Sequence, residues 1–444
     1  MNLLIILINI FPSFFSYLKL PFKRNLSNLN NENLMKNLYT NNIYTEINLG
    51  TPFQNYNFQI KLNQFPLSIL GEEIENISIK KFSSSSSSNF YLNDSTLEYE
   101  EFDFKKGKLL TEKFSLSKTQ NNYSEINNFS IFYVTEINKN YYESGIIGLD
   151  IEGNPYDSGF AYETNLILQL KKRNLIKKET FNFKYTKEDE GILIIGEYPE
   201  FYDSGYKNYT NTAIEFDYVY AKWQIDFSIS YNKVNLPVTT FSLFEIEKGF
   251  IFGNNDFLEE IEKSFFNKFI NKKKCFKESF VYDNKSVVYF VCDESVKISE
   301  MKELKFTEKR HLNVQFIFNY KDLFYKYKNK YYYLVVFSDE NFWILGKPFF
   351  KKYQIIFDKD KKTIGYYKIY NNNNNYNNNN NFSFNKLFFV IIILIIIIFF
   401  LLYKIICKRE NKSKKIRVNE LIENYEYVSE DDLENNKKKV LLSN

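Results

Sequence analysis

The sequence has only one histidine, His311, among its 444 residues. Hydrolysis by a Ser–His or Cys–His pair needs a histidine beside the nucleophile, and most catalytic zinc sites bind the metal through histidine. A single histidine argues against both kinds of site. We therefore predict no metal and no other cofactor.

A strong excess of one charge is also missing. Lysine and arginine total 58 residues against 54 aspartates and glutamates, which leaves a formal charge of +4. Domains that bind nucleic acid usually carry a clear basic excess. The near balance therefore predicts no nucleic-acid partner.

Apolar residues, by contrast, are abundant. Hydrophobic residues make up 44% of the chain and aromatic residues 19%, whereas there are only 14 glycines. Disordered chains are depleted in large apolar residues. Most of this chain is therefore predicted to fold.

Two long apolar runs lie at the two ends of the chain. Residues 1–16 (MNLLIILINIFPSFFS) are typical of a signal peptide, although the usual basic start is missing, and an uncleaved anchor is the alternative. Residues 387–406 can span a bilayer core of about 30 Å as a helix that rises about 1.5 Å per residue. Lysines and arginines follow this run closely, which places residues 407–444 in the cytosol. These features predict a single-pass type I membrane protein whose partner through 387–406 is the lipid bilayer.

Only three cysteines are present, and two of them, Cys275 and Cys292, fall between the two apolar runs. Oxidation is expected on that lumenal side, so this pair can close one short disulfide loop. Eight N-x-S/T sequons in the same region are typical of a glycoprotein. They begin at Asn25, Asn76, Asn93, Asn122, Asn128, Asn208, Asn284 and Asn381.

Short β-type runs dominate residues 43–370. They are rich in Ile, Val, Phe, Tyr and Thr and are separated by Asn, Asp, Ser and Gly. Residues 17–42 and 371–386 are polar and Asn-rich, and the second stretch is typical of a solvated stalk. The clearest predicted strands are 43–49, 58–62, 192–195, 287–291 and 331–337, and the clearest predicted helices are 164–172 and 255–269.

The segment IYTEINLGTPFQNYNFQI, which begins at Ile43, resembles the start of a pepsin-like aspartic protease. In that family a strand, a Gly-Thr-Pro turn and a second strand lead to the first catalytic loop. Further segments follow in the family's order, and the resemblance covers residues 43–370. They are ESGIIGL at 143–149, NLILQLKKRNLI at 165–176, TFNFKYTKEDEGILIIG at 180–196, KWQI at 222–225 and FWILG at 342–346 with the residues after it.

The resemblance implies a mainly β, bilobal pepsin-like fold with short helices and a cleft between the lobes that takes a peptide or protein ligand. The glycine-ended leg formed by Gly145, Ile146, Ile147 and Gly148 has a counterpart in the second half. That counterpart consists of Trp343, Ile344, Leu345 and Gly346. Together with the apolar and polar segments described above, the resemblance divides the chain into a signal peptide (1–16), a prosegment-like polar region (17–42), two lobes (43–215 and 216–370), a stalk (371–386), a transmembrane helix (387–406) and a cytosolic tail (407–444).

The catalytic motifs of the family are altered in this sequence. The family's reaction needs two aspartates about 3 Å apart that share one proton, each in an Asp-Thr/Ser-Gly turn. Counting from the Gly-Thr-Pro turn places Lys61, followed by Leu62 and Asn63, at the first aspartate. The second aspartate falls on Glu245, with Glu247 as the alternative register. We therefore predict no intact catalytic residue and an ion pair between Lys61 and Glu245.

Other parts of the family's site are altered or misplaced in a similar way. The flap tyrosine would fall near Tyr99 or Glu100, without the usual glycine-rich tip. Two Asp-Ser-Gly triplets occur, at 157–159 and 203–205, but neither follows an apolar strand, and ordinary turns explain them.

Three functions remain open at the level of sequence. The leading hypothesis is a pseudoprotease whose ectodomain binds peptides or proteins. The main rival is an active, acid-acting, membrane-anchored aspartic endopeptidase with a displaced carboxylate pair, in the secretory or endolysosomal pathway. A surface-coat or adhesion protein that keeps only the scaffold is the third, because fold alone does not determine activity.

Overall fold

The structure is a computed structural model, and its two compact units are residues 1–370 and 371–444. It describes residues 17–24, 34–40, 42–75, 77–83, 85, 87–88, 90–93, 96–98, 104–116, 126–137, 143–151, 163–215, 222–231, 234–235, 240–282, 285–310, 313–339, 342–369 and 403–404. The first unit contains all of these except the last two residues, and the fold below is that of the first unit.

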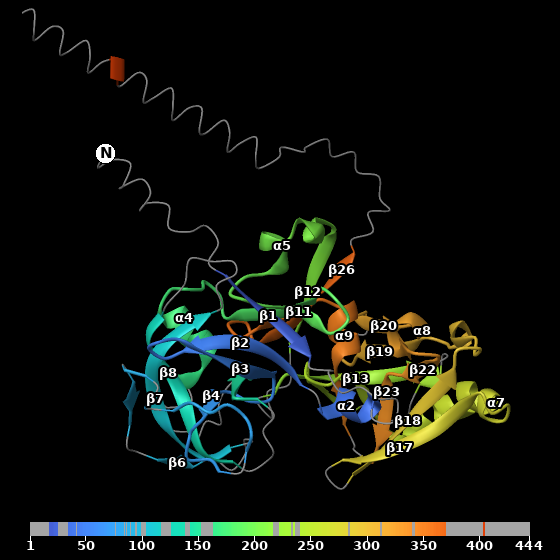
Figure 1. The fold of residues 1–444 in the computed structure, drawn as a ribbon. Coiled ribbons are helices and arrows are strands. Elements are labelled where there is room, and N and C mark those ends of the chain that lie inside the picture. The colour runs from blue at the N-terminus through green and yellow to red at the C-terminus, as the bar shows by residue number, and fades with distance from the viewer. Residues whose placement is uncertain are drawn as a thin grey trace, which may run out of the picture. The chain divides into compact units, whose positions relative to one another are not determined.

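Two large mixed sheets form most of this unit, as expected for a bilobal pepsin-like fold. The first sheet has 14 strands and the second has 12. Figure 1 shows the blue to green strands of the first sheet on one side and the yellow to orange strands of the second sheet on the other.

The first sheet collects the early strands and the last two. Its members are β1 (Leu18–Arg24), β2 (Ile43–Leu49), β3 (Gln54–Lys61), β4 (Leu67–Leu70), β5 (Tyr91–Leu92), β6 (Leu97–Glu98), β7 (Phe104–Leu116), β8 (Ile126–Ile137), β9 (Gly145–Gly148), β10 (Thr180–Tyr185), β11 (Glu190–Ile195), β12 (Tyr209–Glu215), β25 (Ile355–Asp358) and β26 (Thr363–Ile369).

The second sheet is built from the strands between β12 and β25. Its members are β13 (Gln224–Tyr231), β14 (Val234–Asn235), β15 (Thr240–Phe244), β16 (Ile251–Asn254), β17 (Cys275–Tyr282), β18 (Lys285–Asp293), β19 (Leu304–Glu308), β20 (Gln315–Phe318), β21 (Phe324–Tyr327), β22 (Lys330–Tyr333), β23 (Val335–Ser338) and β24 (Trp343–Leu345).

Helices are short throughout the described residues, as predicted. The α-helices are α2 (Leu34–Thr40), α4 (Leu166–Lys172), α5 (Pro199–Tyr202), α6 (Asn255–Ile261), α7 (Asn267–Ile270), α8 (Tyr320–Leu323) and α9 (Lys347–Lys352). A π-helical turn, η4 (Glu262–Phe266), joins α6 to α7, and 3₁₀ turns lie at η2 (Ser204–Asn208) and η5 (Ile298–Glu300).

Residues 17–42 were predicted to be a polar region, but part of this segment forms a strand. β1 begins at Leu18 and lies inside the first sheet, where it pairs along six residues with β11 and at its end with β2. Its burial alternates, with Leu18, Leu20 and Phe22 in the core. This apolar alternation over only seven residues is the strand signal that the surrounding asparagines obscured.

The end of the chain's second half returns to the first sheet. β25 pairs with β10, and β26 pairs with β12. A cluster of aromatic rings lies at this junction, where Phe181 stacks on Phe357 with centroids 4.9 Å apart and Trp223 meets the same phenylalanine edge to face. The Trp223 indole also donates a 2.9 Å hydrogen bond to the carbonyl oxygen of Leu149. Buried aromatic packing therefore couples the two halves.

The predicted disulfide is confirmed. Cys275 and Cys292 lie directly opposite each other on β17 and β18 and are bonded to each other. None of the helices within the described ranges combines enough length with enough apolar character to cross a bilayer. The predicted signal peptide and nearly all of the predicted span at 387–406 lie outside the described residues.

Candidate functional site

The first half of the site is the end of β3. β9 runs parallel to β3, with Ile60 opposite Ile147 and Lys61 opposite Gly148. The same β9 runs antiparallel to β4, where Leu67 faces Ile147. Lys61 therefore lies at the end of β3, and pairing with the glycine-ended leg β9 holds this strand in place.

The second half repeats this arrangement at the end of β15. β24 runs parallel to β15, with Phe244 opposite Leu345, and antiparallel to β16, where Ile251 faces the same leucine. Glu245 follows β15 directly, and Gly346 follows β24. The amide of Glu245 donates a 3.2 Å hydrogen bond to the carbonyl oxygen of Leu345.

The two halves place Lys61 and Glu245 at equivalent points. Each residue immediately follows the strand residue that faces Ile147 or Leu345 in parallel. In each half, the residue that faces the same leg in antiparallel fashion, Leu67 or Ile251, comes six positions later.

Both legs need glycine at their ends because backbone lies against them. A Cβ atom on Gly148 would lie 2.5 Å from the carbonyl oxygen of Gln64. A Cβ atom on Gly346 would lie 2.2 Å from the carbonyl oxygen of Phe250. These contacts explain in physical terms why the two glycine-ended motifs stand out in the sequence.

Glu247 is a buried acid of the site with a raised pKa. Its side chain is 3% exposed, and its Oε2 atom has no hydrogen-bond partner. Burial raises its pKa to about 7, and the neighbouring charge of Glu245 adds to the rise, whereas Lys248 and Lys61 oppose it. Lys61 and Glu245 are therefore both close enough to act on Glu247. The ion pair between Lys61 and Glu245 themselves stays a prediction.

The N-terminal segment also reaches this site. Arg24, which is buried at the end of β1, donates a 2.8 Å hydrogen bond from Nη1 to the main-chain oxygen of Glu247. Its Nε lies 3.7 Å from Asp189, and the buried ammonium of Lys347 lies 3.0 Å from the same carboxylate. These residues come from β1, the β10–β11 turn and α9. A buried ionic cluster therefore links three distant segments to the loop that follows β15, which is called the second loop.

Helix α2 covers the other side of the second loop. The amide of Gly249 donates a 3.1 Å hydrogen bond to the carbonyl oxygen of Leu38. Leu34, Met35 and Leu38 are buried in one apolar cluster with Phe250 and other residues of the second sheet. Figure 1 shows α2, in blue, beside β18 and β23 of the second sheet.

The remaining predicted site residues are placed only in part. The flap candidates Tyr99 and Glu100 lie outside the described residues, in the sequence between β6 and β7, and these two strands pair in antiparallel fashion. The triplet at 157–159 also lies outside them. Asp203 ends α5, accepts a 2.9 Å hydrogen bond from the amide of Gly205 and pairs with Lys184, which lowers its pKa. This second triplet thus forms an ordinary turn.

A comparison with protein-family models matches residues 42–369 to the eukaryotic aspartyl protease family. The chain belongs to this family. A comparison with curated proteins finds no match. Members of the family take peptide substrates or ligands in a cleft, and the family together with the disulfide suggests the secretory pathway.

Sequence reasoning missed four charged groups near the family's site. Arg24 lies in the region 17–42 that was predicted to be polar, and Asp189 and Lys347 lie within longer segments that resemble the family. Asp150, which follows the first leg, is also buried, and its pKa rises to about 7 because of that burial. The available signal was the alternation of Leu18, Leu20 and Phe22, because it predicts a buried strand that ends in arginine.

Proposed function

We propose that this chain is a catalytically inactive member of its family that binds a peptide or protein between its lobes. One observation supports the proposal, namely that Lys61 and Glu245 each come directly after the strand residue that pairs with Ile147 or Leu345 in parallel. The family's reaction needs two carboxylates that share a proton. A lysine ammonium donates hydrogen bonds only and supplies no base at acid pH.

A second candidate is an active endopeptidase with a displaced pair of acids. The observation in its favour is that the charge of Glu245 helps to raise the pKa of Glu247, because a carboxyl group with a pKa of about 7 beside a second carboxylate resembles an acid–base pair. Both acids, however, belong to one turn, whereas the family's pair comes from two lobes. This difference favours the binding function.

The proposed binding site is shared with the chain's own N-terminal segment. Helix α2 packs on the second loop, so a ligand that reaches Glu247 must bind beside this helix or displace it. We further propose that residues 387–406 anchor the protein in a membrane of the secretory or endolysosomal pathway or the cell surface, with the family domain on the lumenal or extracellular side.

The test is cleavage of a mixed fluorogenic peptide library by the glycosylated protein from about pH 3 to pH 7. It compares the wild type with Lys61→Asp/Glu245→Asp, and with Glu245→Gln and Glu247→Gln, each with and without a statine-type inhibitor. We expect no inhibitable cleavage by the folded wild type. Activity gained by the double aspartate variant would support both assigned positions.

Inhibitable cleavage by the wild type would refute the proposal. If that activity disappeared in Glu245→Gln and in Glu247→Gln, the displaced pair would be the site. The peptide-binding half of the proposal is checked separately by panning the same protein against a displayed peptide library. If the protein captured no peptide at any pH in this range, this half of the proposal would be contradicted.

A further inference from the structure

The outer end of the second sheet carries a concentration of lysines. Eight lysines and three carboxylates lie on α7 and η5, on the three turns that follow α7, β18 and β21, and on the adjoining ends of β18, β21 and β22. This region, called the lysine face below, therefore has five positive charges in excess, whereas the whole chain has only four. The lysine face consists of Lys268, Lys272, Lys273, Lys274, Lys297, Lys326, Lys328 and Lys330, with Asp293, Glu294 and Glu300.

Backbone contacts hold these turns together. The amide of Asp293 donates a 2.8 Å hydrogen bond to the carbonyl oxygen of Lys274, and the amide of Glu294 donates one of 3.0 Å to that of Asn329. Asp293 also lies opposite Lys330 in the pairing of β18 with β22. The disulfide joins the strands at the same end. The lysines are thus presented by a fixed framework.

Lysines at the edge of the face pair with two of its three carboxylates. Lys268 lies 2.6 Å from Glu300, and Lys326 lies 3.3 Å from Glu294. The hydrogen bond from Lys268 lowers the pKa of Glu300, and the charges of Lys297 and Lys272 lower it further. Several lysines therefore surround one acid.

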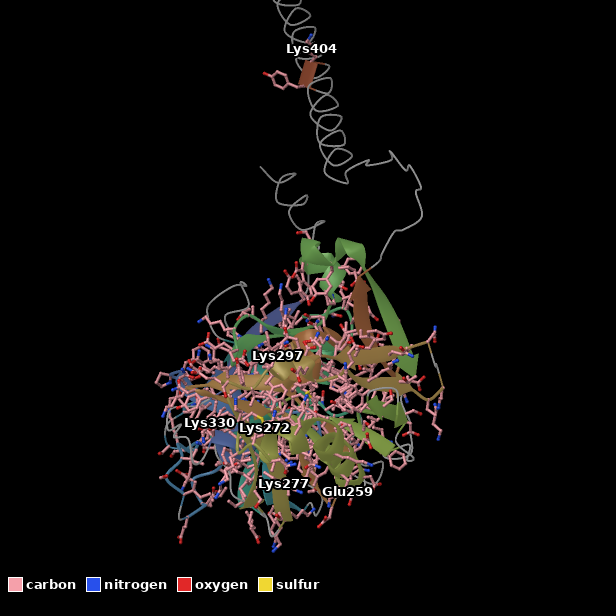
Figure 2. The ribbon with its side chains drawn as sticks, turned by 90° about the vertical axis from the view of Figure 1, so that its right-hand side faces the viewer. Glu259, Lys272, Lys277, Lys297, Lys330 and Lys404 are labelled. Carbon is pink, nitrogen blue, oxygen red and sulfur yellow. A yellow bond between two sulfur atoms is a disulfide. The ribbon has the colours of Figure 1, made fainter. Side chains whose placement is uncertain are left out.

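Six lysines remain after these pairs. None of the six forms an ion pair with another residue in the described part of the chain. Five of them lie in exposed positions, namely Lys272, Lys273, Lys274, Lys297 and Lys328. Figure 2 shows the labelled Lys272, Lys297 and Lys330 on one face, with Lys277 and Glu259 lower on it. Like charges held this close together favour an anionic partner that bridges several of them.

Aromatic rings lie among the lysines. Phe276 is 41% exposed next to the disulfide. The ammonium groups of Lys328 and Lys326 lie over the rings of Tyr327 and Tyr331, at 5.4 and 5.7 Å from the centroids. A ring beside an ammonium suits a sugar unit that carries an acidic group, because the sugar face packs on the ring while the acid meets the charge.

We propose that the lysine face binds a linear sulfated polysaccharide. The charges come from three separate turns, so a chain with regularly repeated sulfates can cross them, whereas a lipid surface is usually met by an amphipathic helix. The disulfide is typical of proteins in oxidising compartments, which argues against nucleic acid as the partner. The proposal goes beyond the proposed function and does not depend on the chemistry of the interlobe site.

The test is lysine footprinting on the full-length protein in neutral detergent. An acetylating reagent is applied with heparin, with uncharged dextran or with no polysaccharide, and the acetylation of each lysine is read by mass spectrometry. We expect heparin, but not dextran, to protect Lys272, Lys274 and Lys297 at about 0.15 M salt, with the protection lost at about 1 M because the Debye length falls from about 8 to about 3 Å. Reading each lysine separately keeps the basic tail from affecting the result.

Matched variants complete the test. The variant Lys272→Gln/Lys274→Gln/Lys297→Gln should weaken heparin binding about tenfold to hundredfold, since each exposed ion pair contributes up to about 1 kcal/mol. The control Lys172→Gln/Lys177→Gln/Lys187→Gln removes the same charge from exposed positions beside the first sheet and should change binding less than about threefold. A triple Lys→Arg variant of the face should keep binding.

Three results would overturn the proposal. One is the same degree of heparin protection at all lysines, and another is an equal loss of binding in the two glutamine variants. The third is tighter binding to a DNA duplex or to phosphatidylserine vesicles than to heparin, with the protection at the lysine face, because the partner would then belong to another class.

Discussion

Arg24 donates a hydrogen bond to the main-chain oxygen of Glu247, a residue 223 positions later in the chain. The donor ends β1 in the first sheet, and the acceptor belongs to the loop that follows β15 in the second. Both residues are buried, at 6% and 3% exposure. The N-terminal strand is therefore part of the framework of the candidate site.

Replacement of Arg24 by methionine tests this role. The change removes the hydrogen bond to Glu247 and the charge beside Asp189, and it leaves a buried carboxylate with less compensation. We expect the free energy of unfolding to fall by about 3 kcal/mol, as for a broken buried ion pair. Urea unfolding followed by tryptophan fluorescence measures the loss.

The neighbouring Lys23→Met is the matched control for that variant. Lys23 pairs with Glu46 at 3.2 Å, but both side chains are about half exposed. Exposed pairs of this kind contribute at most about 1 kcal/mol. If Lys23→Met lowered the free energy of unfolding as much as Arg24→Met, the buried contacts of Arg24 would not stabilise the protein more than an exposed ion pair does.

The sequence predicted the β-rich halves and the glycine-ended legs well, because strand alternation and backbone crowding at glycine are local properties. Gly148 and Gly346 could be recognised for this reason. The contact between Arg24 and Glu247 could not, because it depends on how two distant sheets meet. The apolar pattern of β1 is also only seven residues long, and it lies within a polar, asparagine-rich stretch.

The packing of α2 against the second sheet could not be predicted from the sequence for a related reason. Seven residues give fewer than two full turns, so the helix draws its stability from tertiary contacts. The role of Leu38 follows only from the structure, where its carbonyl oxygen accepts a hydrogen bond from the amide of Gly249. The raised pKa of Glu247 likewise comes from burial that no local pattern encodes.

Gly346→Ala tests the second leg. The added methyl group would meet the carbonyl oxygens of Phe250 and Lys248 at 2.2 and 2.5 Å, and both belong to backbone that cannot rotate away. We expect a loss of about 3 kcal/mol in the free energy of unfolding. Gly205→Ala is the control, because its nearest neighbour is the end of the Asp203 side chain at 3.1 Å. Equal losses in the two variants would contradict the crowding argument.

The disulfide is expected to stabilise the second sheet. It closes a loop with a sequence separation of 17 residues, and a loop of this size corresponds to about 3 kcal/mol in the chain-entropy description. The double variant Cys275→Ser/Cys292→Ser should therefore unfold at lower urea concentration than the wild type. The wild type in a reducing agent should match the double variant, and a difference between the two would attribute the loss to the serines instead.

The pH dependence of stability gives a direct test of the buried acid. Burial and the charge of Glu245 raise the pKa of Glu247 from the ordinary 4.5 to about 7 in the folded protein. Between these values the unfolded chain has released its proton and the folded chain has kept it. Folding stability should therefore fall as the pH rises from about 4.5 to 7, by roughly 3 kcal/mol from this group.

Glu247→Gln isolates this contribution. The amide does not titrate, so the variant should be more stable than the wild type by roughly 3 kcal/mol at about pH 8 and nearly equal to it at about pH 4. Asp150, whose pKa is also raised to about 7, contributes in the same way to both proteins and cancels in the difference. The exposed Glu259→Gln is the control and should show no such trend. If the free energies of unfolding of the wild type and Glu247→Gln differed by a constant amount across this pH range, the pKa of Glu247 would not be raised in the folded protein. Glu247 and Glu245 could then not act as an acid–base pair.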